Sequence, residues 1–383
     1  MLPNRGEIKD RSIGCRPLLS LLAAALMTLA PASGSMPRTH VPLVPAADDV
    51  VGFLYVNNNG AANSVRAFLV RRDGRIESLP GSPFDTRGRG GTSGSLTFAS
   101  ARPTLARAGA FLYAVNIQGG SLSGFRILET GGLQPVAGSP FRLSSPVPFN
   151  PVEMVAAHPS GRLLFSADDT GIIRAMEITA TGSLLASGAA EATVAERPEV
   201  IAVSPDGAHL AVSSGLQGGR LHLFRIGESG ALEPAPGSPM VLAGSEFAGG
   251  LVFDPAGGRL FVASESAAAG RIHVFEIQAG DALVEADGSP LALDALPFPD
   301  DLEISSDGRL LFAADPFTGR IATLAVGPGG ELSETSRFIP DAGADEPAGL
   351  ALSQDGSVLF TTNFSDRSIA VLQVDPSGAL VPA

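Results

Sequence analysis

The chain has 383 residues, of which 44% are hydrophobic and 17% charged, so its composition excludes an intrinsically disordered protein. Its formal net charge of -13 at pH 7 argues against a nucleic acid partner, because an acidic surface repels phosphate backbones. The 46 glycines and 30 prolines predict many tight turns between short strands.

The N-terminus has the pattern of an export signal. A basic start precedes an apolar run over residues 18–29, which is too short to span a bilayer. Ala30-Pro31-Ala32 then fits a small-residue cleavage site. We therefore predict a signal peptide over residues 1–32 and a periplasmic or secreted mature protein. We predict no transmembrane segment, because no later run is long and apolar enough to form one.

An apolar strand pattern then recurs seven times along the chain, roughly every fifty residues. The copies begin at Phe53, Phe111, Leu163, Leu210, Leu260, Leu310 and Val358. A second strand pattern follows each copy, as in IHVFEI from Ile272, and a third starts near a Gly-x-Leu signal. A fourth precedes the next copy and closes in a turn such as SPDG at Ser204. The alternation with period two predicts strands rather than helices.

Repeats of four strands predict the architecture, because one small sheet cannot bury both of its faces but seven packed around an axis can. We predict an all-β fold: a seven-bladed β-propeller of four-stranded antiparallel blades over residues 51–383, expected to be a monomer. Residues 33–50 form an N-terminal segment. Within residues 41–51, a strand can complete the first blade on its inner side or the last on its outer side. The Gly-Ser-Pro motifs, first at residues 81–83, are interpreted as turns after the outer strand, where the chain crosses to the next blade.

The repeats resemble those of a known family. FLYVNN at Phe53 and FTTNF at Phe360 are YVTN-like strands, and they occur together with SPDG turns and a repeated GSPF motif. In these features the chain resembles the lactonase-type seven-bladed propellers, which include 6-phosphogluconolactonase and the fungal carboxymuconate cyclase. The resemblance extends from about residue 50 to residue 383. It implies the propeller fold, whereas propellers carry enzymes and binding proteins alike.

Carboxylates recur at one place in the repeat. Glu153, Glu199 and Asp300 stand eight residues before the glycine of an SPDG-like turn. Because inner strands start at the channel mouth, we expect these three side chains to gather there. We expect Asp168, Glu265 and Asp315 in the neighbouring loops, as further ligand-binding residues or, for Glu265, as a catalytic one.

Three interpretations of these acidic residues stay open. They can bind a cation or a basic group, or they can form an acid/base pair with shifted pKa values. Glu153, Glu199 and Asp300 offer the oxygen ligands that calcium prefers, and calcium is the cofactor that we consider. Alternatively, they are a solvated acidic rim on an acidic protein.

The resemblance implies that this point of the repeat carries His and Arg residues that bind an anionic lactone and handle protons. This chain has Glu153, Glu199 and Gly249 there, whereas Glu265 lines up with a family glutamate. An anionic sugar phosphate would meet repulsion, which argues against 6-phosphogluconolactone as the substrate. An arginine pointing into the channel beside Glu265, from among Arg174, Arg197 and Arg320, would favour an enzyme.

Two functions follow. The first is an exported binding or interaction protein, not a working 6-phosphogluconolactonase, that takes a small-molecule or protein ligand at its acidic channel mouth. The second is a lactonase-like hydrolase of a neutral lactone, with Glu265 as general base and Glu199 or Asp300 as acid or water-orienting group. His222 and His273 are expected to pack between blades. The chain has no Trp, which argues against quinone-dependent, sugar-binding and sialidase-type propellers.

Overall fold

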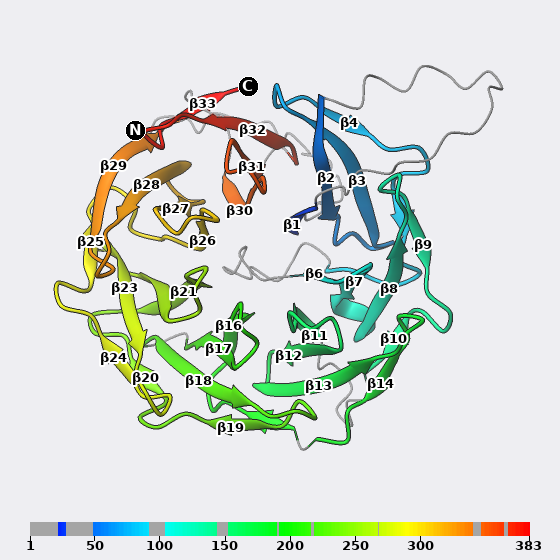
Figure 1. The fold of residues 1–383 in the computed structure, drawn as a ribbon, viewed down its shortest axis with the longest axis horizontal. Helices are drawn as coiled ribbons and strands as arrows, with labels where there is room; N and C mark the ends of the chain where they lie inside the picture. The colour runs from blue at the N-terminus through cyan, green and yellow to red at the C-terminus, as the bar shows by residue number, and fades with distance from the viewer. Residues whose placement is uncertain are drawn as a thin grey trace, which may run out of the picture.

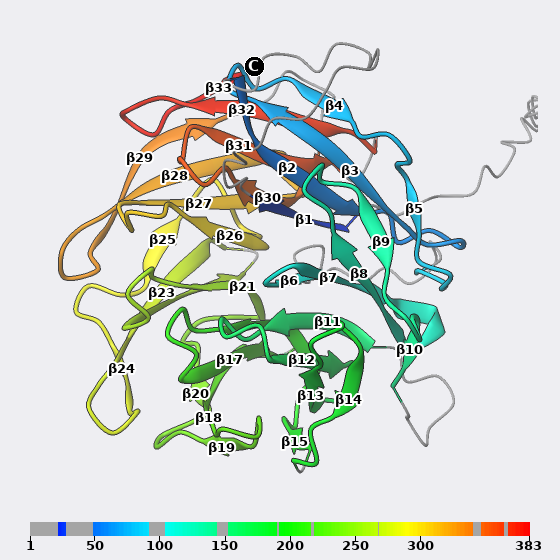
Figure 2. The ribbon, with the colours of Figure 1, turned by 45° about the vertical axis from the view of Figure 1, so that its right-hand side comes forward.

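The computed structural model describes residues 49–91, 104–143, 152–189, 191–215, 218–266, 268–339, 346–363 and 367–383, and the backbone of residues 22–27. These residues form seven antiparallel sheets arranged as blades around a central axis (Figure 1). The predicted all-β, seven-bladed propeller is confirmed. In Figure 2 the strands of each blade follow one another from the channel to the outside of the ring.

The two layers nearest the channel carry the acidic positions. The innermost strands are β1 (Leu22–Met27), β6 (Leu105–Ala108), β11 (Val152–Ala157), β16 (Pro198–Val203), β21 (Phe247–Phe253), β26 (Asp301–Ile304) and β30 (Pro347–Leu352). The second strands are β2 (Val50–Asn57), β7 (Phe111–Asn116), β12 (Leu163–Asp168), β17 (His209–Ser214), β22 (Arg259–Glu265), β27 (Leu310–Asp315) and β31 (Val358–Asn363).

The two outer layers complete each blade. The third strands are β3 (Ser64–Arg71), β8 (Ser121–Ile127), β13 (Ile172–Ile178), β18 (Arg220–Ile226), β23 (Gly270–Ile277), β28 (Arg320–Val326) and β32 (Ile369–Val374). The outer strands are β4 (Ile76–Ser78), β9 (Leu133–Pro135), β14 (Leu184–Ala186), β19 (Leu232–Pro234), β24 (Leu283–Glu285), β29 (Leu332–Phe338) and β33 (Leu380–Pro382). A short 3-10 helix, η2 (Ile117–Gly119), joins β7 to β8. None of the helices among the described residues is long and apolar enough to cross a membrane.

The Gly-Ser-Pro motifs interrupt the outer strand, which is not the position predicted for them. After each motif the strand resumes and pairs again with the same third strand, as β5 (Phe84–Asp85), β10 (Phe141–Arg142), β20 (Met240–Val241) and β25 (Leu291–Leu293). In the third blade, β15 (Ala192–Thr193) resumes the strand without this motif. The Ser82 hydroxyl accepts the Ala67 amide at 3.0 Å, and Ser139, Ser238 and Ser289 do the same in their blades. The serine therefore satisfies an amide that the break in the ladder would leave unpaired.

The core lies between the blades. Seven apolar clusters form among the described residues, each built from two neighbouring blades, and the one formed by Leu54, Val56 and Phe360 joins the first blade to the last. Tyrosine hydroxyls form hydrogen bonds across two of these interfaces. Tyr55 donates to the Gly131 carbonyl at 2.7 Å, and Tyr113 donates to the Gly182 carbonyl at 2.8 Å. Face-to-face packing of this kind fixes where each inner strand meets the channel.

The ring closes between the first and last blades without exchanging a strand. β33 lies beside the first blade in Figure 1, and the Gln373 side chain donates to the Asp73 carbonyl at 3.3 Å. The innermost place in the first blade is taken by β1, not by residues 41–51. Residues 50 and 51 belong to β2, and residues 41–48 lie outside the described residues. β1 falls within the predicted signal peptide, which stays a prediction.

Candidate functional site

Three inner strands bring acidic side chains to the channel mouth. Glu153 in β11, Glu199 in β16 and Asp300 directly before β26 occupy the same place in three blades, as the spacing predicts. Their exposed fractions are 5%, 5% and 3%. Carboxylates this deeply buried are not a solvated rim, so that interpretation of the sequence was wrong.

Arg197, which directly precedes β16, contacts two of the acids. Its Nη2 donates to Glu153 Oε2 at 3.2 Å, and its Nη1 lies 3.6 Å from Glu199 Oε1. One guanidinium thus links neighbouring blades at the mouth. Arg174 instead bonds Asp168 at 2.8 Å, and Arg320 donates to the Ala295 carbonyl. Of the three arginines considered from the sequence, Arg197 is the one that joins the acidic cluster.

Glu265 is the last residue of β22, and its carboxyl group has a strongly raised pKa. Its side chain is 6% exposed, and among the described residues no hydrogen bond reaches its carboxyl group. Burial raises the pKa of Glu265 to about 9, with smaller contributions from the charges of Asp300, Glu199 and Asp315. Glu265 therefore carries a proton at neutral pH.

Asp168 and Asp315 hold their own loops. Asp168 Oδ1 accepts the amides of Thr170 and Ile172, each at 3.1 Å. Asp315 Oδ1 accepts the amides of Phe317 and Thr318, each at 2.9 Å. Each aspartate thus shapes the turn between the second and third strands of its blade. Through this position Asp315 also acts electrostatically on Glu265.

Sequence reasoning missed two buried polar pairs. Each pair links the second strand to the third strand of its own blade, and the two blades are neighbours. Ser214 bonds His222 at 2.9 Å, and Ser264 bonds His273 at 3.0 Å. Glu285 completes a Ser-His-Glu order by contacting His273 Nδ1 at 2.8 Å. Ser264 and His273 are fully buried, so a substrate cannot reach this hydroxyl and the arrangement is structural. Each histidine also stacks on the phenylalanine two residues later in its own strand, so these ring contacts lie within one blade. The packing of His222 and His273 between blades stays a prediction.

β26 carries two further acids, both half-buried, that the sequence did not single out as a pair. Asp301 accepts the Leu350 amide at 2.7 Å, and Glu303 accepts the Leu352 amide at 3.2 Å. Both acids thus bond the open edge of β30 in the next blade. Burial raises the pKa of Glu303 to about 7 and also raises that of Asp301. The signal in the sequence was an acid-x-acid pattern at positions where other inner strands are apolar or small.

Gly249 holds the place where the resemblance implied an Arg-His pair. A Cβ atom there would lie 2.5 Å from the Pro299 carbonyl oxygen, and one on Gly250 would lie 2.8 Å from that of Asp300. The two glycines let the fifth and sixth blades approach closely. No larger side chain fits at this point of the mouth without moving the backbone.

No three acidic or histidine side chains within the described ranges are placed to hold a metal ion. The calcium site predicted at Glu153, Glu199 and Asp300 therefore has no geometric support, since Arg197 already contacts the two glutamates.

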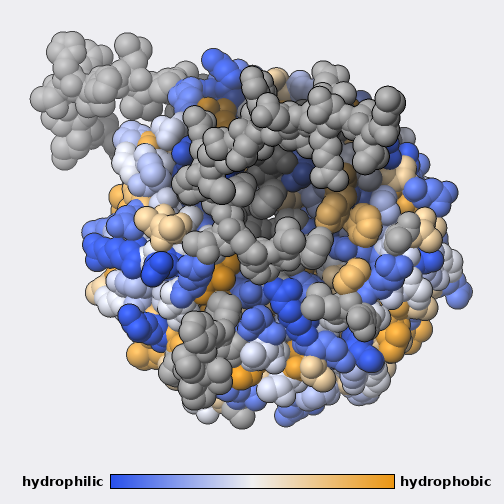
Figure 3. Space-filling model, turned by 180° about the vertical axis from the view of Figure 1, so that it is seen from behind, coloured by the Kyte–Doolittle hydropathy of each residue, from blue (hydrophilic) through white to orange (hydrophobic). Residues whose placement is uncertain are grey.

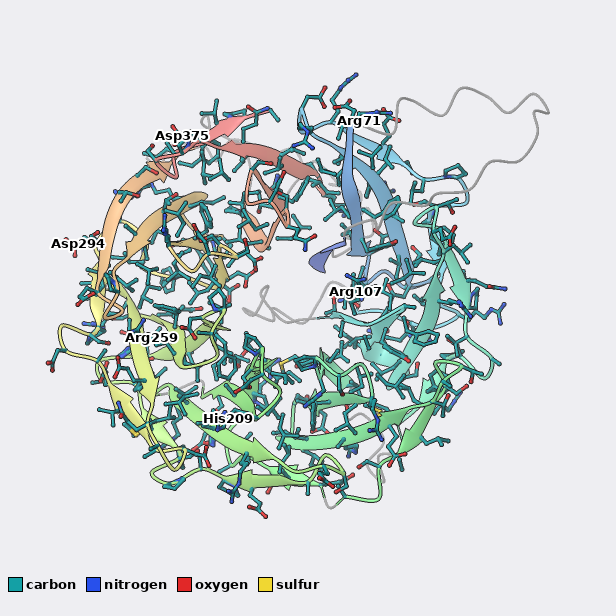
Figure 4. All side chains as sticks on the ribbon, viewed as in Figure 1. Arg71, Arg107, His209, Arg259, Asp294 and Asp375 are labelled. Carbon is teal, nitrogen blue, oxygen red and sulfur yellow. The ribbon has the colours of Figure 1, made fainter. Side chains whose placement is uncertain are left out.

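Figure 4 shows Arg107 of β6 toward the centre of the ring, whereas Asp294 and Asp375 lie at its outer margin. On the face seen in Figure 3, hydrophilic residues cover much of the described surface, with hydrophobic residues at places along the margin.

Comparison with known proteins supports the lactonase-like fold. The family model described as "Lactonase, 7-bladed beta-propeller" matches residues 259–383. A candidate 6-phosphogluconolactonase from Bacteroides uniformis is 20% identical, with a TM-score of 0.63 over 78% of this chain and 84% of that one. The periplasmic gluconolactonase of Pseudomonas aeruginosa is 18% identical, with a TM-score of 0.61 over 86% and 93%. No curated protein matches the chain.

A protein named for a different reaction also has a similar fold. Hydrazine synthase from Kuenenia stuttgartiensis is 16% identical, with a TM-score of 0.58 over 89% of this chain and 99% of that one. The predicted resemblance to lactonase-type seven-bladed propellers is confirmed. Likeness at this level of identity shows the fold alone, so the function has to be argued from the channel mouth.

Proposed function

We propose that the protein is an exported, lactonase-like propeller that binds a small cationic ligand at its acidic channel mouth. The observation that carries the proposal is Glu265, a buried carboxyl group held close to Asp300, Glu199 and Asp315. Arg197 compensates Glu153 and Glu199. A cation beside Glu265 would favour its ionised form and take over the role of its proton.

Calorimetric titration of the full chain with methylammonium chloride tests this proposal. Because the cation displaces a proton from Glu265, its apparent affinity should rise by up to about tenfold per pH unit between about pH 6 and pH 8. Glu265→Gln should remove this pH dependence, whereas Glu129→Gln, at an exposed position, should keep it. Failure of methylammonium to bind the wild-type chain would reject the proposal.

The contact between Arg197 and Glu199 favours a second candidate, hydrolysis of a neutral lactone. The raised pKa of Glu265 exchanges the roles expected from the sequence, because a protonated carboxyl group is an acid rather than a base. Water would attack the lactone carbonyl, Glu199 or Asp300 would accept its proton, and Glu265 would protonate the departing alkoxide. Arg197, 3.6 Å from Glu199, would supply positive charge to an oxyanion that develops beside this glutamate.

Hydrolysis of δ-valerolactone separates the two candidates. A working lactonase should lose most of its turnover in Glu265→Gln, by about a hundredfold or more, and keep it in Glu129→Gln. A binding protein should show no turnover above the uncatalysed rate. Turnover that survives Glu265→Gln would exclude this residue as the acid.

Export is part of the proposal and rests on the basic start and apolar run before Ala32. Cleavage there would also remove β1 and leave the inner edge of β2 without its partner. N-terminal sequencing of the exported protein should read from Ser33, and an intact N-terminus would reject cleavage. Comparing the thermal midpoints of residues 1–383 and 33–383 then measures what β1 adds to the first blade.

A further inference from the structure

An aromatic pair borders the acidic cluster. The rings of Phe298 and Phe317 lie 4.9 Å apart at an interplanar angle of 56°. Phe298 belongs to the segment that enters β26, and Phe317 to the turn between β27 and β28. Phe317 is 57% exposed, and large apolar side chains at such exposure are worth explaining when they gather.

The backbone ties this pair to the acids. Asp315 accepts the amides of both phenylalanines, each at 2.9 Å, through its two carboxylate oxygens. The carbonyl of Pro297, next to Phe298, accepts the amide of Ser266, which directly follows Glu265. The loop that carries Phe298 therefore packs on the segment that carries Glu265 and leads into Asp300.

The Glu265 carboxyl group indicates which charge a ligand at this place would carry. Its carboxyl group is buried, interacts with the charges of Asp300, Glu199 and Asp315, and receives no hydrogen bond from the described residues. A buried carboxyl group without such a bond is costly unless something else uses it. The segments bonded to Ser266 and Asp315 carry two rings, Phe298 and Phe317, and the faces of such rings attract cations electrostatically.

We infer that the channel mouth takes an organic cation, a quaternary or alkyl ammonium compound, whose charge faces the carboxyl groups and whose apolar groups contact Phe298 and Phe317. This inference rests on the proposed function and narrows its ligand class. A strongly hydrated inorganic cation would gain little from the rings, whereas a methylated ammonium group sheds water easily and packs against them. The aromatic pair thereby decides which cations bind.

Titration with three probes tests the ligand class. Choline carries the charge and the methyl groups, 3,3-dimethylbutan-1-ol has the same shape without charge, and methylammonium has charge with little apolar surface. Wild-type chain should bind choline most tightly, and the neutral alcohol at least about tenfold more weakly. Phe317→Leu should weaken choline binding by about threefold to thirtyfold and leave methylammonium binding unchanged. Phe141→Leu, a half-buried ring on the outer strand, is the matched control and should change neither.

The outcomes distinguish the inference from the proposal beneath it. If choline binds equally well to wild type and to Phe317→Leu, the rings do not contribute to choline affinity and the inference is overturned. Binding of methylammonium in the same experiment would still support the cation site of the proposed function. Equal affinity for choline and its neutral isostere overturns both. Because Phe317 is more than half exposed, its replacement leaves the packing between blades intact, and circular dichroism confirms that the variant is folded.

Discussion

Replacing Glu265 with glutamine should stabilise the protein above acidic pH. In the folded chain the pKa of Glu265 rises from 4.5 to about 9, so the folded state keeps a proton that the unfolded state has released. Stability therefore falls as pH rises between these two values. At about 1.4 kcal/mol per pKa unit, the cost reaches about 3 kcal/mol near pH 7 and about 6 kcal/mol near pH 9. Glutamine imitates the protonated side chain and does not ionise.

Urea unfolding at about pH 5, 7 and 9 measures the effect as the difference between Glu265→Gln and wild type. The difference should be small at the lowest pH and grow to several kcal/mol at the highest. The subtraction removes the contributions of all other titrating groups, including Glu303. Glu129→Gln, at an exposed position, should show no such growth. A variant less stable than wild type near pH 9 would refute the reasoning, because it would mean that the ionised Glu265 has a partner.

Three further predictions concern the scaffold of the propeller. Gly249→Ala should destabilise the protein by about 2–4 kcal/mol, because its Cβ atom would meet a carbonyl of the next blade at 2.5 Å. Gly258→Ala, with open space around it, is the control in thermal unfolding. Ser289→Ala should cost about 1–2 kcal/mol in the same assay by leaving the Val274 amide unpaired, and no loss would contradict the role assigned to the motif. Because the pKa of Glu303 is raised from 4.5 to about 7, the free energy of unfolding should fall as pH rises between these values, and Glu303→Gln should reduce this fall. An unchanged dependence of the unfolding free energy on pH would contradict this.

The repeat made the fold predictable from sequence. Period-two strands returned seven times, and seven small sheets need one another to bury both faces. The place of the Gly-Ser-Pro motif was not predictable, because a turn signal does not tell whether the same strand resumes after it. The hydroxyl of Ser82 bonding an amide of the third strand depends on the spatial register, which local sequence does not contain.

The sequence predicted where the acidic residues lie in the fold, but not their burial, ion pairing or protonation. Counting back from the SPDG-like turns placed Glu153, Glu199 and Asp300 at one level of the channel. Their burial, and the contact of Arg197 with two of them, depends on how closely neighbouring blades pack. The protonation of Glu265 follows from that burial, so no local pattern could have indicated it.

Proton and ligand compete for the same charge at this mouth. Arg197 is shared between Glu153 and Glu199, so it does not offset the remaining acids. When Glu265 is protonated, the cluster carries one negative charge fewer. When a cation is bound, the Glu265 carboxyl group can ionise and pair with the cation. Cation affinity must then rise with pH until Glu265 titrates, near pH 9. An anionic ligand would follow the opposite trend, because ionisation of Glu265 adds repulsion, so the sign of the pH dependence alone assigns the charge of the natural ligand.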